Sequence, residues 1–357
     1  MTEISFPERI GTAARSAAKA SLTRYIARRL ALTLITLWLI TVVVFVITNI
    51  LPGNPALVRL GSLATPEALA AEEHRMGLDR PLLERYVDFV GGALHGDLGT
   101  AFSTEHPVAS DIKERFPATL ELALFATFLA TLIGVPIGFY SAVRRGSHAD
   151  HAIRNVAGFS AAMPVFWLGL ILAYVFAFQL GWAPTPTGRL AVNEHSPPGV
   201  TGFYTFDSLI AGDFGLFSSA LAHLALPAVT LAFIELAPMI KMSRSAMLEI
   251  LQTEYVRTSR AMGFGGWQIF RKDALRNALV PVLTTLGIVV GYLVAGSVVV
   301  ELVYSWPGIG KYAFGAVRSN DFNAIQGFIL VTATVYVLLN MVIDILYAVI
   351  DPRIRLG

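Results

Sequence analysis

An all-α polytopic membrane fold is predicted by three observations on this sequence. Hydrophobic residues make up 55% of its 357 positions and charged residues only 15%, a balance that soluble domains do not have. Six charge-poor apolar runs are each long enough to cross a bilayer, which takes about 20 residues of helix. The Lys and Arg residues are concentrated in alternate connecting segments, and this pattern orients membrane proteins.

The six apolar runs are the predicted transmembrane helices. The first, "LALTLITLWLITVVVFVITNIL", is long for a signal-peptide core and no small-residue cleavage site follows it, so we expect it to remain as an anchor. Prolines fall inside or at the ends of later runs, where each removes a backbone hydrogen bond and permits a kink. The runs are 30–51, 117–143, 155–182, 215–240, 277–300 and 323–350, and the prolines are Pro136, Pro164, Pro227, Pro238 and Pro281.

A pair of small residues marks one face of the second run. Gly134 and Gly138 are four positions apart, so they lie on the same side of a helix and allow a neighbouring helix to approach closely. We expect tight helix packing there rather than a moving hinge.

The connecting segments alternate in charge. With the N-terminus inside, the inner segments hold 18 of the 27 Lys and Arg residues, and the outer segments hold the other 9. The positive-inside rule therefore predicts a multi-pass protein with both termini in the cytoplasm. The inner segments are 1–29, 144–154, 241–276 and 351–357.

The connecting and terminal segments also differ in content. Residues 52–116 contain Gly and Pro breaks and a plausible helix cap at Thr65, which predicts two short helices. Residues 183–214, rich in Pro, Gly and Thr, predict an irregular loop. Residues 301–322 have a Pro-Gly turn and then a short amphipathic piece. The basic, Ala-rich residues 1–23 lack a stable apolar stripe, so we expect a mobile tail.

Acidic residues are scarce in the apolar runs. A carboxylate at the bilayer centre costs about 2.5–3.5 kcal/mol on the insertion scale, so these residues should face protein or water. All lie toward the ends of their runs, which disfavours a proton-driven carrier and favours capping or packing. The candidate polar residues of a path or of helix packing are Glu121, Glu235, Glu301 and Asp344.

Motifs for catalysis and cofactor binding are missing. The sequence has no cysteine and no G-x-x-x-x-G-K-[ST], H-E-x-x-H or G-x-S-x-G pattern, so it predicts no thiolate metal site, nucleotide loop, protease or hydrolase. His148 and His151 are the one pair at helical spacing, and a solvated loop face explains them. We expect no catalytic, cofactor or metal site in this chain, and no nucleic-acid partner.

The stretch "EYVRTSRAMGFGGWQIFRKDALRNALVP", residues 254–281, is a polar insert between two long apolar runs. Helical spacing from Leu248 to Met262 puts apolar residues on one side and charged residues on the other. Three glycines at positions 263–266 end this helix, and a second helix restarts at Trp267. An amphipathic helix at this place fits either a groove in another protein or the membrane surface.

A resemblance favours the first alternative. The loop "EYVRTSRAMGFGGWQIFRKDALRNALVPVLT" resembles that of ABC importer permeases of the dipeptide/oligopeptide group, first-permease type. "RYIARRLALTLITLWLITVVVFVITNILPGNPA", "RMGLDRPLLERYVDF", "GDLGTAF", "RFPATLELALFA", "MPVFWLGLIL", "ELVYSWPGIG" and "LYAVIDPRIR" are similar to further landmarks of that group. The similarity runs in order from about residue 24 to the C-terminus. Arg257, Thr258 and Ser259 replace the Glu-Ala-Ala of importers in general, as is typical of the peptide group, whereas Met262 stands where that group often has Lys.

The resemblance implies a type I ABC importer permease fold and a division of labour between subunits. Expected partners are a homologous second permease, two ABC ATPase subunits that bind ATP and magnesium, an extracytoplasmic substrate-binding protein, a peptide substrate and the lipid bilayer. The loop would be a coupling helix seated in an ATPase cleft, with Tyr255 and Met262 as apolar contacts, Arg257 and Arg260 as a polar rim, and Gly263 as the turn. The implied coupling residues are Glu254, Tyr255, Arg257, Thr258, Arg260, Ala261, Met262 and Gly263.

The sequence predicts four segments along the chain and leaves two alternatives for its function. We expect a cytoplasmic tail (1–23), a first helix with its outer segment (24–116), a five-helix ABC type-1 permease core (117–350) and a second cytoplasmic tail (351–357), in a bacterial inner membrane. A nickel or glutathione importer of the same family would share this architecture. A secondary carrier would need a midplane acid or a broken-helix ion site, which the sequence does not offer.

Overall fold

The computed structural model describes residues 6–50, 54–61 and 64–350. These ranges are almost entirely helical, and their only β-type pairing is an isolated bridge between Thr100 and Pro107. The first half contains α1 (Phe6–Ile50), α2 (Pro55–Leu60), α3 (Pro66–Arg75), α4 (Leu82–Leu94), α5 (Val108–Val143), α6 (His148–Ala162), α7 (Val165–Leu172) and the π-helix η1 (Ala173–Gln179). The second half contains α8 (Tyr204–Ile210), α9 (Phe214–Leu251), α10 (Glu254–Ala261), α11 (Gly266–Ile269), the π-helix η2 (Phe270–Ala274), α12 (Leu275–Gly296), α13 (Val298–Val303), α14 (Ile309–Arg318) and α15 (Phe322–Ile350).

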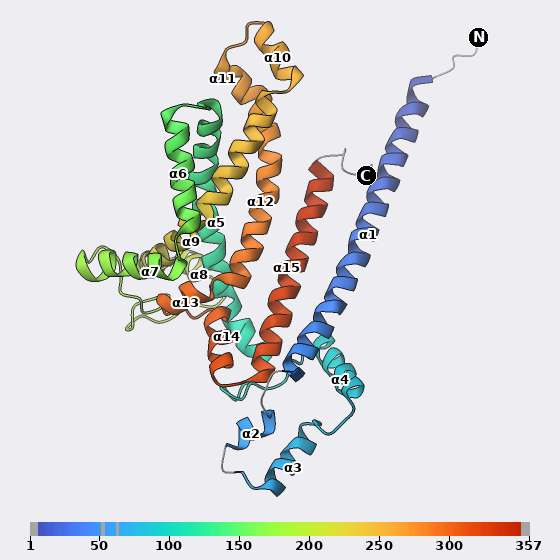
Figure 1. Cartoon of the computed structure of the whole chain (residues 1–357), viewed down its shortest axis with the longest axis vertical. Coiled ribbons are helices and arrows are strands. Elements are labelled where there is room, and N and C mark those ends of the chain that lie inside the picture. Colours follow the sequence, from blue (N-terminus) through green and yellow to red (C-terminus); the bar gives the residue numbers. More distant parts are fainter. Residues whose placement is uncertain (1–5, 51–53, 62–63, 351–357) are drawn as a thin grey trace.

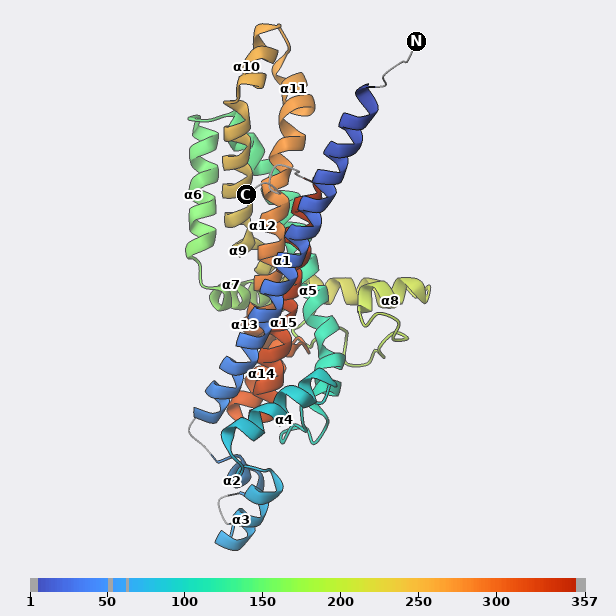
Figure 2. The same ribbon diagram turned by 90° about the vertical axis from the view of Figure 1, so that its right-hand side faces the viewer.

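The long helices form one elongated bundle. In Figure 1, α5, α6, α9 and α12 stand side by side, and α15 and α1 complete the bundle on the other flank. The two views place α10 at one end and the α2–α3 insert at the opposite end, while α7 and α8 lie across the bundle (Figure 2). Within the described residues, five single helices are long and apolar enough to cross a membrane, in agreement with five of the six predicted runs.

The sixth predicted run, 155–182, is not a single helix. α6 ends at Ala162, and α7 with η1 leaves it at an angle of 99°, which is the geometry of a broken span or of a re-entrant loop. Pro164 causes the break, because it has no N–H to donate and holds Met163 in an extended conformation. The other four prolines of the prediction lie inside α5, α9 and α12, which continue through them.

Gly134 and Gly138 bring α5 and α9 into backbone contact, as predicted. A Cβ at Gly134 would lie 2.8 Å from the Met239 Cβ, and one at Gly138 would lie 2.7 Å from the carbonyl oxygen of Ile240. Both distances are too short for any larger residue without movement of the helices. This close approach fixes α5 and α9 as the central pair of the bundle.

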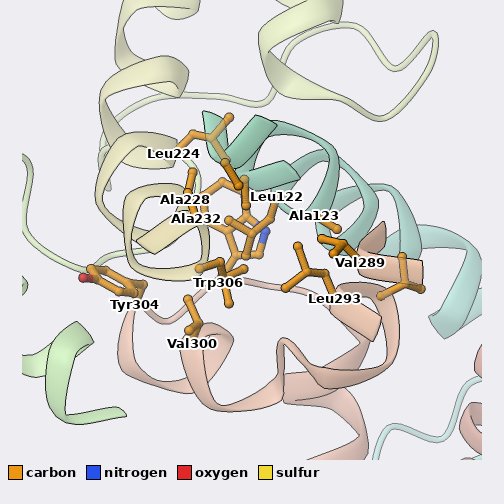
Figure 3. Close-up of a cluster of buried hydrophobic side chains, with 14 of the residues drawn as sticks. Leu122, Ala123, Leu224, Ala228, Ala232, Val289, Leu293, Val300, Tyr304 and Trp306 are labelled. Carbon is orange, nitrogen blue, oxygen red and sulfur yellow. The ribbon is translucent and has the colours of Figure 1, made fainter. Parts of the chain in front are cut away.

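The main hydrophobic core lies between α5, α9, α12 and the segment after α12. Trp306 is its largest fully buried side chain, and Figure 3 shows it between the helix that carries Leu122 and the helix that carries Leu224. The Trp306 ring N–H donates to the carbonyl of Ala118 at 2.8 Å, so this polar atom is satisfied inside the core. Val289 and Leu293 of α12 close the cluster.

The connecting segments are more ordered than the sequence predicts. The 52–116 insert holds three short helices (α2–α4) before α5 begins, not two, and Thr65 caps α3 as expected by accepting the N–H of Ala68 at 3.3 Å. The 183–214 loop contains α8. Residues 6–23 continue α1 as helix, which their high alanine content favours; the mobility predicted for this tail stays a prediction. The predicted tail 351–357 lies outside the described residues.

Candidate functional site

The end of the bundle marked by α10 is formed by a helical hairpin between α9 and α12. α10 begins after Thr253, which is in an extended conformation, and it ends in a left-handed turn at Gly263, whose φ is +85°. The N–H of Gly263 donates to Arg260 O at 3.0 Å and that of Phe264 to Ser259 O at 3.2 Å, which is a Schellman motif. The glycine predicted as the turn therefore has the conformation that favours glycine.

α10 is a separate helix and not an extension of α9. The stripe predicted from Leu248 to Met262 is wrong, because α9 ends at Leu251 and Leu248 packs with it inside the bundle. The buried face of α10 consists instead of Val256, which is fully buried, and Ser259. This face is smaller than the sequence suggests, so hydrogen bonds supplement it.

Two polar contacts hold α10 against η2 and α12. The Ser259 hydroxyl donates to the Asp273 carboxylate at 2.9 Å. The Asn277 amide donates to the Tyr255 hydroxyl at 3.1 Å. Because these partners come from the other arm of the hairpin, α10 is fixed in position rather than free to lie in any direction.

The outer surface of the hairpin carries large apolar side chains. Met262 is 63% exposed and Trp267 is 71% exposed, and Tyr255 and Phe264 are also exposed. Exposed apolar groups clustered at one tip mark an interaction surface. We call this set, Tyr255, Met262, Phe264 and Trp267, the tip patch. Phe264 and Trp267 were not among the sequence candidates, although aromatic residues interleaved with glycines in a polar loop are a signal for them.

The charges around the tip patch are solvated. Arg257 pairs with Glu254 at 2.7 Å, and both side chains are largely exposed, so the pair itself contributes little stability. Arg260 is exposed as well. All the sequence-predicted coupling residues, Glu254, Tyr255, Arg257, Thr258, Arg260, Ala261, Met262 and Gly263, are exposed at this one tip.

The tip patch is connected to the bundle by stacked rings. Trp267 stacks on Phe270 with centroids 5.4 Å apart, and Phe270 meets Phe139 of α5 edge-on at 6.3 Å. Phe139 belongs to a second hydrophobic cluster that also contains Met247 of α9 and Val282 of α12. A force on the tip therefore reaches three long helices through direct contacts.

The four acidic candidates have different surroundings. Glu121 forms a buried ion pair with Arg189 of the 183–214 loop at 2.5 Å and accepts the Thr205 N–H at 2.9 Å. Asp344 of α15 pairs with Arg29 of α1 at 2.6 Å. The carboxylate of Glu235 is buried in α9, and no hydrogen bond reaches it from the described residues. The structure therefore does not bring these acids together into one site.

Glu301 organises the segment between α12 and α14. It is fully buried and accepts hydrogen bonds from Thr119 Oγ1 at 2.7 Å, Ser297 Oγ at 2.9 Å and the Lys311 N–H at 2.8 Å. A Cβ at Gly308 would overlap its carboxylate, which explains glycine after proline in "WPGIG". We call Glu301, Thr119 and Ser297 the Glu301 cluster. It is a structural clamp between α5 and the segment after α12, and only the acid itself was foreseen.

Comparisons with known proteins give consistent results. The family model described as "Binding-protein-dependent transport system inner membrane component" matches residues 134–356, and the corresponding N-terminal model matches residues 22–123. The di/tripeptide transport system permease protein of Pseudomonas aeruginosa is 43% identical over 332 residues, covering 93% of this chain and 98% of the relative. The dipeptide transport system permease protein of Alkalihalophilus pseudofirmus is 42% identical, with coverages of 93% and 99%. The glutathione transport system permease protein of Escherichia coli is 33% identical, with coverages of 93% and 98%.

Proposed function

The chain belongs to the family of binding-protein-dependent transport system inner membrane components, and on that premise we propose that it is the permease subunit of an ATP-driven importer of di- and oligopeptides. The family is one of ABC transport permeases, so the predicted type I permease fold and the multi-pass membrane location are confirmed. Peptide is the proposed substrate, because the more similar relatives are named for dipeptides or for di- and tripeptides.

The observation that carries the coupling role is the construction of α10. It is a short helix with an exposed apolar tip patch, a charged rim and a fixed seat on η2 and α12. A preformed helix of this kind fits a groove in a partner protein. In the proposed mechanism the tip patch enters a cleft of an ATPase subunit, and closure of the ATPases pulls α9 and α12 toward an outward-open arrangement.

The remaining partners follow from this role. Two ATPase subunits bind ATP and magnesium and hydrolyse the nucleotide, and this chain contributes transport rather than catalysis. A homologous second permease encloses the path, and an extracytoplasmic binding protein delivers the substrate. The excess of basic residues in the inner segments supports a cytoplasmic location for both termini and for α10.

Other substrates within the family are the competing proposals. Glutathione is itself a peptide, and the relative named for it is less similar, at 33% identity. Nickel has no named relative among the proteins compared above. A secondary carrier does not fit, because family membership places the chain among binding-protein-dependent transporters.

Co-purification tests the proposal. The chain is extracted in mild detergent, and the proteins bound to it are identified by mass spectrometry. We expect a second permease, an ATPase and a binding protein, and ATP-dependent uptake of a labelled dipeptide once the complex and its binding protein are reconstituted in vesicles. A chain that purifies alone, or uptake driven by an ion gradient without ATP, would contradict the proposal.

A further inference from the structure

A pocket of about 910 Å³ lies at the end of the molecule opposite α10. It is lined by the end of α1, the α2–α4 insert, the loop before α5 and the start of α15, elements that Figure 1 shows meeting at that end. Phe45, Phe89 and Phe322 give it an apolar wall. The pocket is distinct from both the tip patch and the Glu301 cluster.

The wall formed by α1 and α4 is held in place by specific contacts. The ring of Phe45 stacks on Phe89 at 6.0 Å and meets Tyr86 edge-on at 5.4 Å. The hydroxyls of Thr41 and Tyr86 form a hydrogen bond at 2.8 Å. The pocket is therefore preformed and does not need a ligand to assemble it.

One of the four arginines at this pocket has no acidic partner among the residues that the structure describes. The other three pair with Glu72 or Asp88 at distances of 3.1–3.3 Å. These paired residues are Arg59, Arg75 and Arg80. Arg85 has no carboxylate within 4 Å among the described residues, and the sequences of 51–53 and 62–63 contain no acidic residue.

The surroundings of Arg85 favour an anionic ligand. Its partial burial lowers the pKa of the guanidinium, because burial removes part of the hydration of the charge. A carboxylate that accepts two parallel hydrogen bonds is the ligand that best satisfies an arginine in such a place.

A carboxylate also lines the pocket. Asp97 is fixed by its own N–H, which donates to Gly92 O at 2.9 Å, and its side chain accepts the Gly99 N–H at 2.9 Å. No Lys or Arg pairs with it among the described residues. Gly92 follows Arg85 by seven residues on α4, which places the two on the same helix face about 10 Å apart along the axis.

This arrangement selects a ligand with opposite charges at its two ends. An extended peptide spans about 3.3–3.6 Å per residue, so a zwitterion of two or three residues has its charges about 7–10 Å apart, which is comparable to the axial spacing between Arg85 and Gly92. We propose that this outer pocket binds a di- or tripeptide, with the peptide carboxylate on Arg85 and the ammonium group on Asp97. The apolar wall receives a side chain of the peptide. The choice of peptide as ligand rests on the proposed function.

Equilibrium binding to the intact complex tests the assignment. The permease pair with its ATPases is placed in lipid nanodiscs without the binding protein, and binding of labelled trialanine is measured. We expect saturable binding that Arg85→Gln weakens about tenfold or more, since a charge-assisted bidentate contact is lost. Arg318→Gln is the matched control, because Arg318 is exposed on α14 and does not line the pocket; it should bind as the unchanged protein does.

Blocked peptides identify which end of the ligand meets which residue. Trialanine amide should bind the unchanged complex weakly and should lose nothing further with Arg85→Gln. N-acetyl-trialanine should also bind the unchanged complex weakly, and it should lose nothing further with Asp97→Asn. Three results would each overturn the proposal: trialanine binding by the Arg85→Gln complex equal to that of the unchanged complex, a further loss when a blocked peptide is combined with the variant of its proposed contact, or no saturable binding at millimolar peptide.

Transport by the same preparations separates this proposal from the proposed function. If the unchanged complex with its binding protein imports peptides while Arg85→Gln binds trialanine normally, only the pocket assignment fails. If the unchanged complex imports no peptide at all, the proposed function fails. A loss of binding-protein affinity in Arg85→Gln with unchanged trialanine binding would assign the pocket to the partner protein and overturn the peptide site.

Discussion

Arg244 of α9 and Asp150 of α6 form a bidentate ion pair with nitrogen–oxygen distances of 2.8 and 2.9 Å. Ser141 of α5 donates a third hydrogen bond to the same carboxylate. One buried acid therefore joins three helices. Because only two residues separate α9 from α10, these helices are the platform that supports the tip patch.

Removal of the arginine should destabilise this platform. Arg244→Met leaves the buried carboxylate of Asp150 without its charged partner, which we expect to cost about 3 kcal/mol or more. The apparent Tm of the purified complex in detergent should fall by several degrees. Arg145→Met is the control, since Arg145 is exposed and has no ion pair within the described chain; equal Tm values for the two variants would show that the pair is not stabilising.

The proposed orientation can be tested with single cysteines, because the native sequence has none. Ser147 precedes α6 on the predicted inner side, and Ser196 lies in the predicted outer loop. In intact cells with a permeable outer envelope, Ser196→Cys should react with an impermeant thiol reagent and Ser147→Cys should not. The reverse pattern would place α10 outside and remove its proposed contact with ATPases.

The turn after α10 should tolerate only glycine. Gly263 has φ +85°, a conformation that costs other residues about 1–2 kcal/mol, so Gly263→Val should displace the tip patch and uncouple ATP hydrolysis from uptake. Gly265→Val is a close control, since Gly265 has φ −67° and open space around its Cβ position. Both proteins should reach the membrane in normal amounts. Equal uptake by the two variants would contradict a coupling role for this turn.

Charge reversal at the rim distinguishes a partner contact from a local ion pair. Arg257→Glu should reduce ATP-dependent uptake, because it breaks the pair with Glu254 and reverses the charge presented by α10. The double variant Glu254→Arg/Arg257→Glu restores an ion pair within α10, but with the positive and negative charges exchanged between the two positions. If Arg257 faces an ATPase, the double variant stays defective, whereas full recovery would restrict the role of Arg257 to α10 itself.

Crosslinking tests the proposed contact directly. Thr258 is exposed on α10, whereas Val256, two positions earlier, is fully buried. Thr258→Cys should form a disulfide with a cysteine placed in the cleft of an ATPase subunit, and Val256→Cys should not. If no position between 254 and 263 forms a crosslink to an ATPase subunit, the proposed contact is wrong and α10 is a helix on the lipid surface.

The long elements were predictable because hydropathy alone determines them. The continuous helices α5, α9 and α15 contain the apolar runs predicted for them, and the turn at Gly263 was expected from a glycine that follows a helix. The break at Pro164 was harder to predict, because the same residue type continues as helix at Pro227. Whether a proline kinks or ends a helix depends on the neighbours that repair the lost hydrogen bond, and these are not evident from sequence.

Partners that are distant in sequence account for most of what sequence reasoning missed. Glu121 was named as a candidate for the path or for helix packing, but its partner Arg189 lies 68 positions away in a segment without helical periodicity. Phe264 and Trp267 of the tip patch are exposed through the fold of the hairpin, not through their spacing. Arg85 became informative only when the structure showed its neighbouring arginines already paired.

The prolines inside α9 have a mechanical consequence. The helix is 38 residues long and contains Pro227 and Pro238, and each proline removes a backbone hydrogen bond and permits a bend. Only two residues separate its C-terminus from α10. The 13 residues after Pro238 rise about 20 Å, so a tilt of about 5° at that proline moves the end of α9 by about 2 Å. A larger displacement of α10 therefore needs a bend at both prolines or a joint movement of α9 and α12.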